Sequence, residues 1–445
     1  MKSSIKSRIA LTSFQTIVLG FAGLILIGTF LLMLPLSSAS GEMTAFTDAL
    51  FTSTTSVCVT GLVVQDTGTY WSLFGQMVIL LLIQIGGLGV ITIAAFLTIA
   101  AGGKIGLFQR SVMQEAVAAP QIGGIIRLIG LILRFTLVVE TIGAVVMFPV
   151  FCKDFGVLRG IWMSIFHSVS AFCNAGIDLM GIRKPYSSLT SYLSNPIINI
   201  TIMGLIIIGG IGFLTWDDVR SHGFHIKKYK MQSKVILAAT GLLILFPAIC
   251  FFLFEFRDLP LGQRIWNSLF QAVTPRTAGF NTVDLASMNE SGQMMMILLM
   301  LIGGAPGSTA GGMKITTLAV LIACAAAVFR KRDSAQLFGR RIAQNTIATA
   351  ATLFLLYVGL SIGGAMVIGI VEGLPLITCL YETASALATV GLTLGITPEL
   401  SILSKYILIG LMFLGRVGGL TFIYAAQSKK QVQIGKFPQE KITVG

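Results

Sequence analysis

The chain has 445 residues, of which 55% are hydrophobic and only 11% are charged. A soluble globular domain carries about a quarter of its residues as charged groups, so this composition excludes an ordinary soluble protein and predicts an integral membrane protein. The formal net charge of +13 at pH 7 could indicate nucleic-acid binding. However, the Lys and Arg residues stand in short clusters between apolar runs, which is typical of cytoplasmic loops beside a membrane. We therefore expect membrane lipid and no nucleic acid as a partner.

The first forty residues resemble a signal peptide, because Lys2, Lys6 and Arg8 precede an apolar run. That run extends from Ile9 to Leu36, whereas the apolar region of a signal peptide has about 7–15 residues. A helix that crosses a bilayer needs about 20 residues. We interpret this segment as a first transmembrane helix that is retained.

Four parts of the chain repeat one pattern: a long apolar run, a short amphipathic stretch, a small-residue turn ending in Gly, and a second long apolar run. The turns end at Gly61, Gly176, Gly279 and Gly391, and an aromatic residue begins each short stretch. Four matches in register, over almost the whole chain, indicate an internal repeat. The long runs pair as residues 11–36 with 72–100, 125–151 with 196–219, 234–256 with 293–329, and 345–371 with 403–427.

Each repeat is expected to cross the membrane twice, so that all four repeats have the same orientation. The sequence therefore predicts an all-α integral membrane protein. Its four parallel helix–pore helix–filter loop–helix repeats, with eight transmembrane helices, would form a pseudo-fourfold arrangement around one pore. We expect the repeats at residues 1–103, 104–232, 233–341 and 342–428, followed by a cytoplasmic C-terminal tail at residues 429–445.

The distribution of Lys and Arg predicts the orientation. Twenty of the 31 positive residues lie in the N-terminus, in segments 104–127, 220–234 and 330–341, and in the tail 429–441. The loops of the opposite side carry eight. We expect both termini in the cytoplasm and the small-residue turns on the outer side of a plasma membrane.

The short stretches and their turns have a chemical purpose in this arrangement. Non-helical backbone at membrane depth is tolerated only where it lines water or protein, and a ring of backbone carbonyls can replace the hydration shell of a cation. Glycine permits the bend that such a turn needs. Turn formation or helix packing alone would also use glycine, but four turns in register favour a selectivity filter. The predicted filter residues are Cys58, Val59, Thr60 and Gly61; Cys173, Asn174, Ala175 and Gly176; Arg276, Thr277, Ala278 and Gly279; and Ala388, Thr389, Val390 and Gly391.

The four turns resemble those of the potassium transporter superfamily that includes the bacterial TrkH and KtrB subunits with their plant and fungal relatives. Val59-Thr60-Gly61-Leu62 and Thr389-Val390-Gly391-Leu392 are similar to the first part of the filter signature of tetrameric potassium channels, whereas the second and third turns are more divergent. In this superfamily, Gly in all four turns accompanies potassium preference, and Ser in the first turn accompanies sodium preference. The resemblance implies K+ as the transported ion. The alternative is a sodium-selective or poorly selective transporter of the same fold.

The second apolar run of the third repeat contains five glycines and a proline within ten residues, which cannot form a regular helix. The stretch lacks the Gly-Lys-Ser/Thr ending of a phosphate-binding loop. A packing kink is one interpretation, and the resemblance implies another, a loop below the filter that gates ion passage. The gate residues would be Gly303, Gly304, Ala305, Pro306, Gly307, Ser308, Thr309, Ala310, Gly311 and Gly312, with Lys314 and Arg416.

Arg416 lies inside the last apolar run, where an unpaired charge costs about 2.5–3.5 kcal/mol or more. We expect it beside the gating loop, as an electrostatic barrier to cations. Lys314 could act in the same way or extend its ammonium group to the cytoplasmic face. Arg276 could pin the pore mouth, and Glu382 or Asp48 could pair with it or draw cations inward.

No clustered nucleophile and base lie within the apolar runs, so a transporter is favoured over an enzyme. Asp217, Asp218, His222 and His225 could form a metal cluster, but they lie in a basic loop, and we expect a solvated loop with no metal beyond the transported cation. TrkH-type chains have an additional helix pair before the first repeat, for which no room exists before Ile9. The closer resemblance, to KtrB, implies a homodimer, a cytoplasmic nucleotide-binding ring of the KtrA type that holds ATP or ADP, and potassium uptake assisted by Na+.

Overall fold

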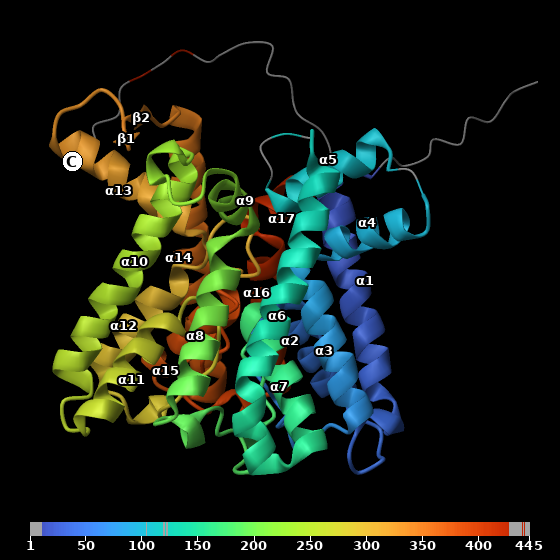
Figure 1. The fold of residues 1–445 in the computed structure, drawn as a ribbon. Coiled ribbons are helices and arrows are strands. Elements are labelled where there is room, and N and C mark those ends of the chain that lie inside the picture. The colour runs from blue at the N-terminus through green and yellow to red at the C-terminus, as the bar shows by residue number, and fades with distance from the viewer. Residues whose placement is uncertain are drawn as a thin grey trace, which may run out of the picture.

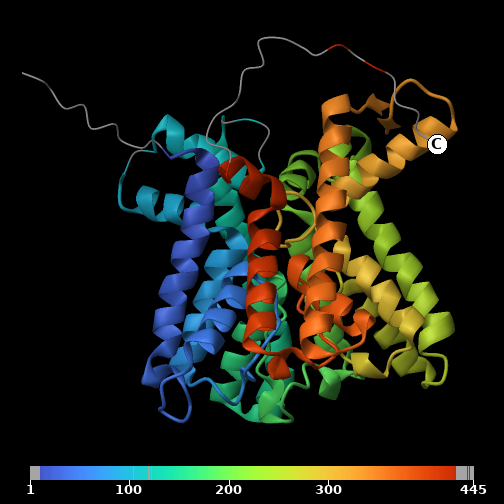
Figure 2. The ribbon, with the colours of Figure 1, turned by 180° about the vertical axis from the view of Figure 1, so that it is seen from behind.

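The structure is a computed structural model that describes residues 11–103, 105–118, 121, 123–426, 438 and 440. It is mostly helical, and its long helices run side by side (Figures 1 and 2). The expected N-terminal cluster of Lys2, Lys6 and Arg8 lies outside the described residues, as does nearly all of the tail 429–445. The helices are α1 (Ser13–Met33), α2 (Phe46–Cys58), α3 (Leu73–Leu88), α4 (Val90–Ala100), α5 (Leu107–Val117), α6 (Ile125–Phe155), α7 (Val157–Phe172), α8 (Pro196–Ile211), α9 (Phe213–His222), α10 (Met231–Cys250), α11 (Leu261–Val273), α12 (Glu290–Leu301), α13 (Ile315–Phe329), α14 (Gln344–Glu372), α15 (Leu376–Leu387), α16 (Ile402–Val417) and α17 (Gly419–Ala426).

The mostly helical class is confirmed, with one small departure from the all-α expectation. Strands β1 (Gln336–Leu337) and β2 (Arg340–Arg341) pair antiparallel in a short hairpin between α13 and α14. The hairpin lies at the upper end of the molecule in Figure 1. It connects two long helices and contributes little to the core.

Within the described residues, four helical segments are long and apolar enough to cross a membrane: α1, α6, α10 with the π-helical turn that continues it to Glu255, and α14. Three pairs, α3 with α4, α8 with α9, and α16 with α17, pass the same test if each bent pair is one span. The described part of the chain thus has four to seven candidate spans, fewer than the eight predicted. The difference is the run 293–329, which the structure divides into α12 and α13.

Three runs that the sequence predicts as continuous are bent in the structure. The bends measure 93° between α3 and α4, 91° between α8 and α9, and 93° between α16 and α17. One glycine with a positive φ lies at each bend: Gly89 (89°), Gly212 (91°) and Gly418 (92°). A residue with a Cβ rarely adopts this backbone conformation. The bends in the runs 72–100, 196–219 and 403–427 were not predicted, whereas the break in 293–329 was expected.

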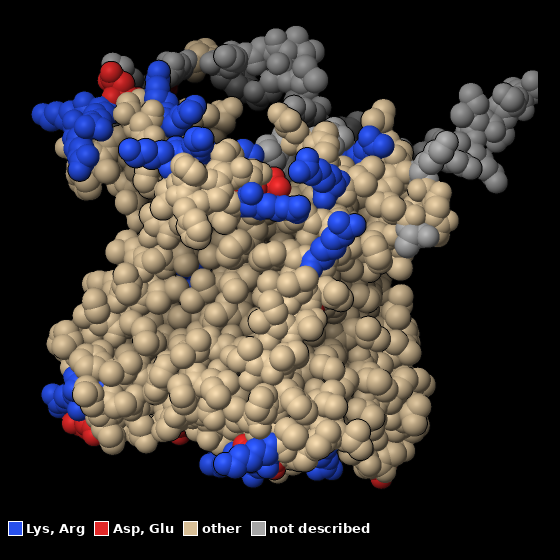
Figure 3. Space-filling view, in the orientation of Figure 1, with Lys and Arg blue, Asp and Glu red and all other residues tan. Residues whose placement is uncertain are grey.

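The outer surface shows that the helices face an apolar solvent. Leu81, Ile142, Leu245 and Leu355 are each more than half exposed although they lie inside long helices, away from the ends. Figure 3 shows Lys and Arg gathered at the upper end, a smaller charged group at the lower end, and an almost uncharged band between them. Such a band is expected where lipid tails surround the protein.

Four short helices, α2, α7, α11 and α15, are here called the inner helices. Each packs against long helices of its own part of the chain: α2 against α1 and α3, α7 against α6 and α8, α11 against α10, and α15 against α14 and α16. They lie in the lower half of the molecule in Figure 1. The aromatic residue of each inner helix is fully buried, which fixes the helix in the core: these residues are Phe51, Phe166, Phe270 and Tyr381.

Candidate ion pore

Each inner helix leads into a turn with an unusual backbone. Two residues of every turn have a positive φ, the glycine and the residue two positions before it. Non-glycine residues in this conformation cost about 1–3 kcal/mol, and they persist where the surrounding structure holds them, often at functional sites. The pairs are Val59 (56°) with Gly61 (103°), Asn174 (59°) with Gly176 (62°), Thr277 (64°) with Gly279 (86°), and Thr389 (52°) with Gly391 (92°).

A hydroxyl group near the end of each inner helix holds the turn. The N–H of Gly61 donates to Oγ1 of Thr55 at 2.9 Å, and the N–H of Gly391 donates to Oγ of Ser385 at 3.0 Å. In the other two turns, Ser170 and Thr274 donate to the carbonyl of the residue after the turn glycine. The sequence prediction did not include these positions. The available signal was a Ser or Thr five or six residues before every turn glycine.

The four turns meet one another in a closed cycle. A Cβ added to Gly61 would lie 2.6 Å from the carbonyl oxygen of Ala175. Each of the other three turn glycines would collide in the same way with a neighbouring turn. The cycle runs from Gly61 to Ala175, from Gly176 to Ala278, from Gly279 to Val390, and from Gly391 back to Thr60. All sixteen predicted filter residues are buried.

The carbonyl oxygens in this cycle stay without a protein partner. Among the described residues, no hydrogen bond ends on the carbonyl oxygen of Thr60, Ala175, Ala278 or Val390. A buried carbonyl without a partner is rare, because it loses its hydration and gains nothing in return. Carbonyl oxygens of this kind, one from each turn of the closed cycle, are suited to bind a cation.

Two cavities flank the cycle of turns. The outer cavity, of about 290 Å³, is lined by the four turn glycines and by acidic residues. The inner cavity, of about 240 Å³, is lined by Gly87, Gly312, Lys314 and Arg416. The buried turns therefore lie between the outer cavity and the inner cavity. The acidic residues of the outer cavity are Asp66, Asp178, Asp284 and Glu399.

The segment 302–314 between α12 and α13 lies directly against the inner side of the turns. A Cβ added to Gly312 would lie 2.8 Å from the carbonyl oxygen of Ala388. Thr309 donates its hydroxyl to the carbonyl of Phe172 at 3.0 Å. The N–H of Ala305 donates to the carbonyl of Gly210 at 2.9 Å. The segment is thus anchored at several points to the second and fourth repeats.

Arg416 ties this segment to α3. Its guanidinium donates to the carbonyl of Thr309, to that of Gly86, and to that of Gly87 at 3.0 Å. Each hydrogen bond from a charged group contributes about 1.5–3 kcal/mol to stability. The three bonds of Arg416 therefore offset much of the free-energy cost of a charge at this depth. Arg416 occupies the position at which the other three repeats have Gly87, Gly210 and Gly304.

Lys314 also points to the segment and not to the cytoplasmic face. Its ammonium group donates to the carbonyl oxygens of Ala310, at 2.7 Å, and of Gly311, at 3.4 Å. It lines the inner cavity together with Arg416. Lys314 therefore lies against the segment 302–314, and its role there stays a prediction.

Arg276 is buried beside the third turn, and no carboxylate pairs with it among the described residues. Its carbonyl accepts a hydrogen bond from the Asn174 side chain at 3.0 Å, which links the second and third turns. Glu382 and Asp48 do not reach it. Glu382 binds the loop after the fourth turn, and Asp48 contacts Lys405 and Gln65. The pairing proposed for Arg276 is wrong.

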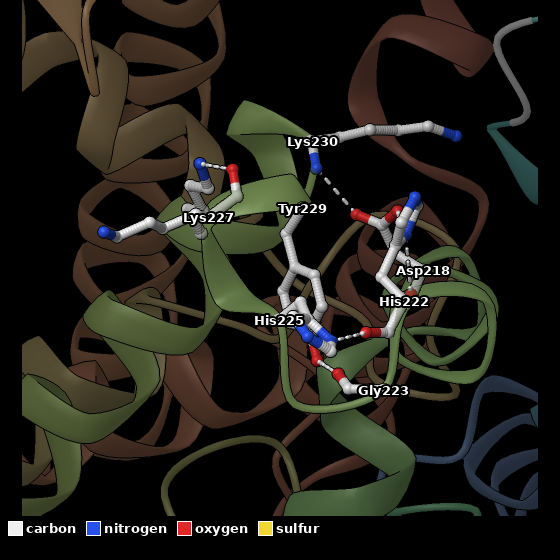
Figure 4. A network of polar contacts seen from close by, with 8 residues as sticks. Asp218, His222, Gly223, His225, Lys227, Tyr229 and Lys230 are labelled. Atoms are coloured by element: carbon white, nitrogen blue, oxygen red, sulfur yellow. Dashed lines mark hydrogen bonds and ion pairs between the residues drawn. The ribbon is translucent and has the colours of Figure 1, made fainter.

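The histidines at the end of α9 belong to a loop network (Figure 4). Asp218 accepts the backbone N–H of Lys230 at 2.8 Å and lies 3.2 Å from His222. His225 contacts the carbonyl of His222 at 3.1 Å. Within the part of the chain that the structure describes, no group of three or more His, Cys, Asp or Glu side chains could hold a metal ion.

Comparison with known proteins assigns the chain to a family. The TrkH family model, described as a cation transport protein, matches residues 2–434. The chain belongs to the TrkH family. It is accordingly a multi-pass membrane protein of a family of ion transporters, and the resemblance to TrkH and KtrB is confirmed.

Several relatives match over almost their whole length. The chain is 41% identical to the potassium/sodium uptake protein NtpJ of Enterococcus hirae, over 100% of this chain and 99% of that protein. It is 37% identical to the Ktr system potassium uptake protein B of Bacillus subtilis, over 97% of this chain and 96% of that protein. The crystal structure of the potassium transporter TrkH from Vibrio parahaemolyticus has the same fold, with a TM-score of 0.74 and 21% identity over 96% of this chain and 86% of that chain.

Two glycines, one at the end of the fourth turn and one four residues later, allow a test that distinguishes contact between the turns from backbone strain. Gly391 and Gly395 have similar φ values, 92° and 95°, but only Gly391 faces another turn, whereas nothing lies within 4 Å of a Cβ at Gly395. We expect Gly391→Ala to abolish cation uptake, because its Cβ would push the Thr60 carbonyl out of place. Gly395→Ala should keep most of the uptake at similar protein levels. Equal losses in both variants would contradict a role of the cycle.

Proposed function

We propose that this protein takes up potassium across the bacterial plasma membrane through a selectivity filter made by its four turns. The observation that carries the proposal is the closed cycle of buried carbonyl oxygens without a protein partner. Carbonyl rings of this kind replace the water around a potassium ion. The names of the relatives, which speak of potassium or potassium/sodium uptake, support K+ as the transported ion.

The repeat architecture is part of this proposal. Eight transmembrane helices result if each bent pair is one span and if α12 and α13 together form the eighth, broken by the segment 302–314. Four parallel repeats at residues 1–103, 104–232, 233–341 and 342–428 then surround one pore with pseudo-fourfold symmetry. The turn glycine and a positive φ two residues before it recur in all four turns, which supports this symmetry.

We infer that the upper end of the molecule in Figure 3 is cytoplasmic, because most Lys and Arg side chains gather there. The outer cavity then faces the outside and the inner cavity faces the cytoplasm. Both termini are cytoplasmic on this orientation, and the tail 429–445 lies on the same side. The acidic residues of the outer cavity would raise the local concentration of cations in front of the filter.

The segment 303–312, with Lys314 and Arg416, acts as the gate. It lies between the filter and the inner cavity, and two positive side chains bind its carbonyl groups. A cation that leaves the filter must pass these charges. Opening the gate requires the segment to release Arg416, which bonds to the carbonyl of Thr309, and the carbonyls of Gly209 and Gly210 in α8.

A homodimer with one pore in each chain, controlled by a cytoplasmic nucleotide-binding ring of the KtrA type, is proposed from the resemblance to KtrB. Relatives named as Ktr system proteins support a partner subunit. ATP or ADP would bind to that ring and not to this chain. Na+ would assist uptake, either as a coupled ion or as a modulator.

The second candidate is a transporter of the same fold that carries sodium or discriminates poorly. The name of the Enterococcus hirae relative includes sodium, which supports this alternative. Uptake of rubidium and of sodium by cells that lack their own potassium transporters distinguishes the two. We expect rubidium uptake to exceed sodium uptake; a preference for sodium would contradict the potassium proposal.

The same assay with Gly61→Ser tests whether the filter sets the preference. A side chain at Gly61 would meet the Ala175 carbonyl at 2.6 Å and would strain a φ of 103°. We expect the rubidium-to-sodium ratio to fall by about tenfold, which corresponds to about 1.4 kcal/mol. Gly41→Ser is the control, since Gly41 also has a positive φ but open space around it. An unchanged ratio in Gly61→Ser would contradict the filter model.

Removing the positive charge of Arg416 tests the gate. Arg416→Gln loses the charge and at least one of the three bonds that tie the segment 302–314 to α3. Losing about 1.5–3 kcal/mol of charged hydrogen bonding should increase cation leak by about tenfold or more. Arg416→Lys, which keeps the charge, should leak less. An unchanged leak in Arg416→Gln at normal protein level would contradict the gating role.

A further inference from the structure

The residue directly after the buried aromatic of each inner helix is polar in all four repeats. These residues are Thr52, His167, Gln271 and Glu382, and none is more than 4% exposed. Such burial of polar groups is costly unless they are hydrogen-bonded. Their partners therefore indicate why the chain keeps polar side chains at this position.

In three repeats the partner is the residue three positions after the turn glycine. Glu382 accepts the N–H of Leu394 at 3.2 Å. The N–H of Leu179 contacts Nε2 of His167 at 3.4 Å, and Gln271 donates to Oγ1 of Thr282 at 3.5 Å. The spacing from Gly176, Gly279 and Gly391 is the same in each case. The same contact therefore recurs in three repeats, made by a carboxylate, an imidazole and an amide side chain.

The His167 contact also defines the state of the imidazole ring. Nδ1 lies 2.7 Å from the carbonyl oxygen of Met163, which can only accept a hydrogen bond. Nδ1 must therefore carry the proton, and Nε2 of the neutral ring has a lone pair for the N–H of Leu179. The ring thus joins its own helix to the outer part of the second turn.

The first repeat makes a related link one helical turn earlier. Asp48, four residues before Thr52, accepts a hydrogen bond from the Gln65 side chain at 2.9 Å, and Gln65 lies four residues after Gly61. Lys405 lies 3.5 Å from the other oxygen of Asp48. The four repeats therefore all join the inner helix to the chain that leaves the turn.

Glu382 makes the most extensive of these links. Besides the N–H of Leu394, its carboxylate accepts the hydroxyl groups of Thr393 and, at 2.9 Å, of Thr397. Thr393 and Leu394 line the outer cavity. One fully buried carboxylate thus holds the wall of that cavity to the helix that precedes the filter.

We propose that His167, Gln271, Glu382 and Asp48 are positioning residues that set ion selectivity by fixing the outer end of each filter turn. The hydroxyl groups of the inner helices already hold each turn at its glycine or at the residue after it. With the chain held again three or four residues after the glycine, a turn cannot widen or narrow to suit the ion. Discrimination between potassium and sodium depends on the spacing and the field of the carbonyl groups.

Glu372 provides a matched control for Glu382. Its carboxylate also accepts three hydrogen bonds, from the N–H and hydroxyl of Ser401 and from the hydroxyl of Ser404. These partners belong to the N-terminus of α16 and not to a filter turn. Loss of either carboxylate removes a similar set of contacts, but only Glu382 holds the filter.

The proposal rests on the proposed function and is tested by the ratio of rubidium to sodium uptake in full-length Glu382→Gln, Glu382→Ala and Glu372→Gln. We expect a fall of about tenfold in Glu382→Ala. Glu382→Gln should be intermediate, because its side-chain oxygen can still accept from Leu394. Glu372→Gln should keep the wild-type ratio. A wild-type ratio in Glu382→Ala, or an equal fall in Glu372→Gln, would overturn the proposal.

A second measurement does not depend on transport. Amide hydrogen exchange of the segment 391–397 should accelerate in Glu382→Gln and stay unchanged in Glu372→Gln. Unchanged exchange in both variants would overturn the positioning role even if the protein carries another ion. A wild-type protein that takes up neither ion preferentially, together with faster exchange in Glu382→Gln, would contradict the proposed function alone and would leave the link itself supported.

Discussion

Four buried carbonyl oxygens, one from each turn of a closed cycle, impose a constraint on the rest of the structure. Backbone carbonyls in a membrane interior must find a partner, yet those of Thr60, Ala175, Ala278 and Val390 lie against neighbouring turn glycines without a hydrogen bond from the described residues. Keeping them there requires strained turns, hydroxyl groups that hold each turn at or just after its glycine, and polar side chains that hold the chain that leaves the turn. The inner helices and their buried aromatics supply a rigid base for all of these.

The same close packing explains the glycines of the long helices. Glycines 86, 209 and 415 lie so close to carbonyl groups at the ends of inner helices that a Cβ would collide with them. Three residues later, a glycine with positive φ bends each chain away. The fourth repeat has Arg416 where the first and second repeats have Gly87 and Gly210, and the third repeat has a loop in place of the bend. The two exceptions meet through the bond from Arg416 to Thr309, where we propose the gate.

The composition was sufficient to predict a helical membrane protein, because contact with lipid demands apolar side chains. The spacing of the turn glycines located the four turns, whereas their role as a filter stays a prediction. The bends at Gly89, Gly212 and Gly418 were not predicted, because a straight helix and a bent helix can have the same apolar composition. Neither Glu382 nor Asp48 pairs with Arg276, because each carboxylate binds nearer groups that the sequence does not place: the loop after the fourth turn for Glu382, and Gln65 and Lys405 for Asp48. The contacts of His167, Gln271 and Glu382 could not be predicted, because they depend on where the loops after the turns lie in space.

Density for a transported ion tests the central claim most directly. A structure of the protein in rubidium or thallium, whose scattering distinguishes them from water, should show an ion on the axis between the carbonyl oxygens of Thr60, Ala175, Ala278 and Val390. Replacement of that ion by sodium should weaken or displace the density. An axis without bound ion in a saturating concentration of rubidium, or an ion bound only elsewhere in the protein, would contradict the account.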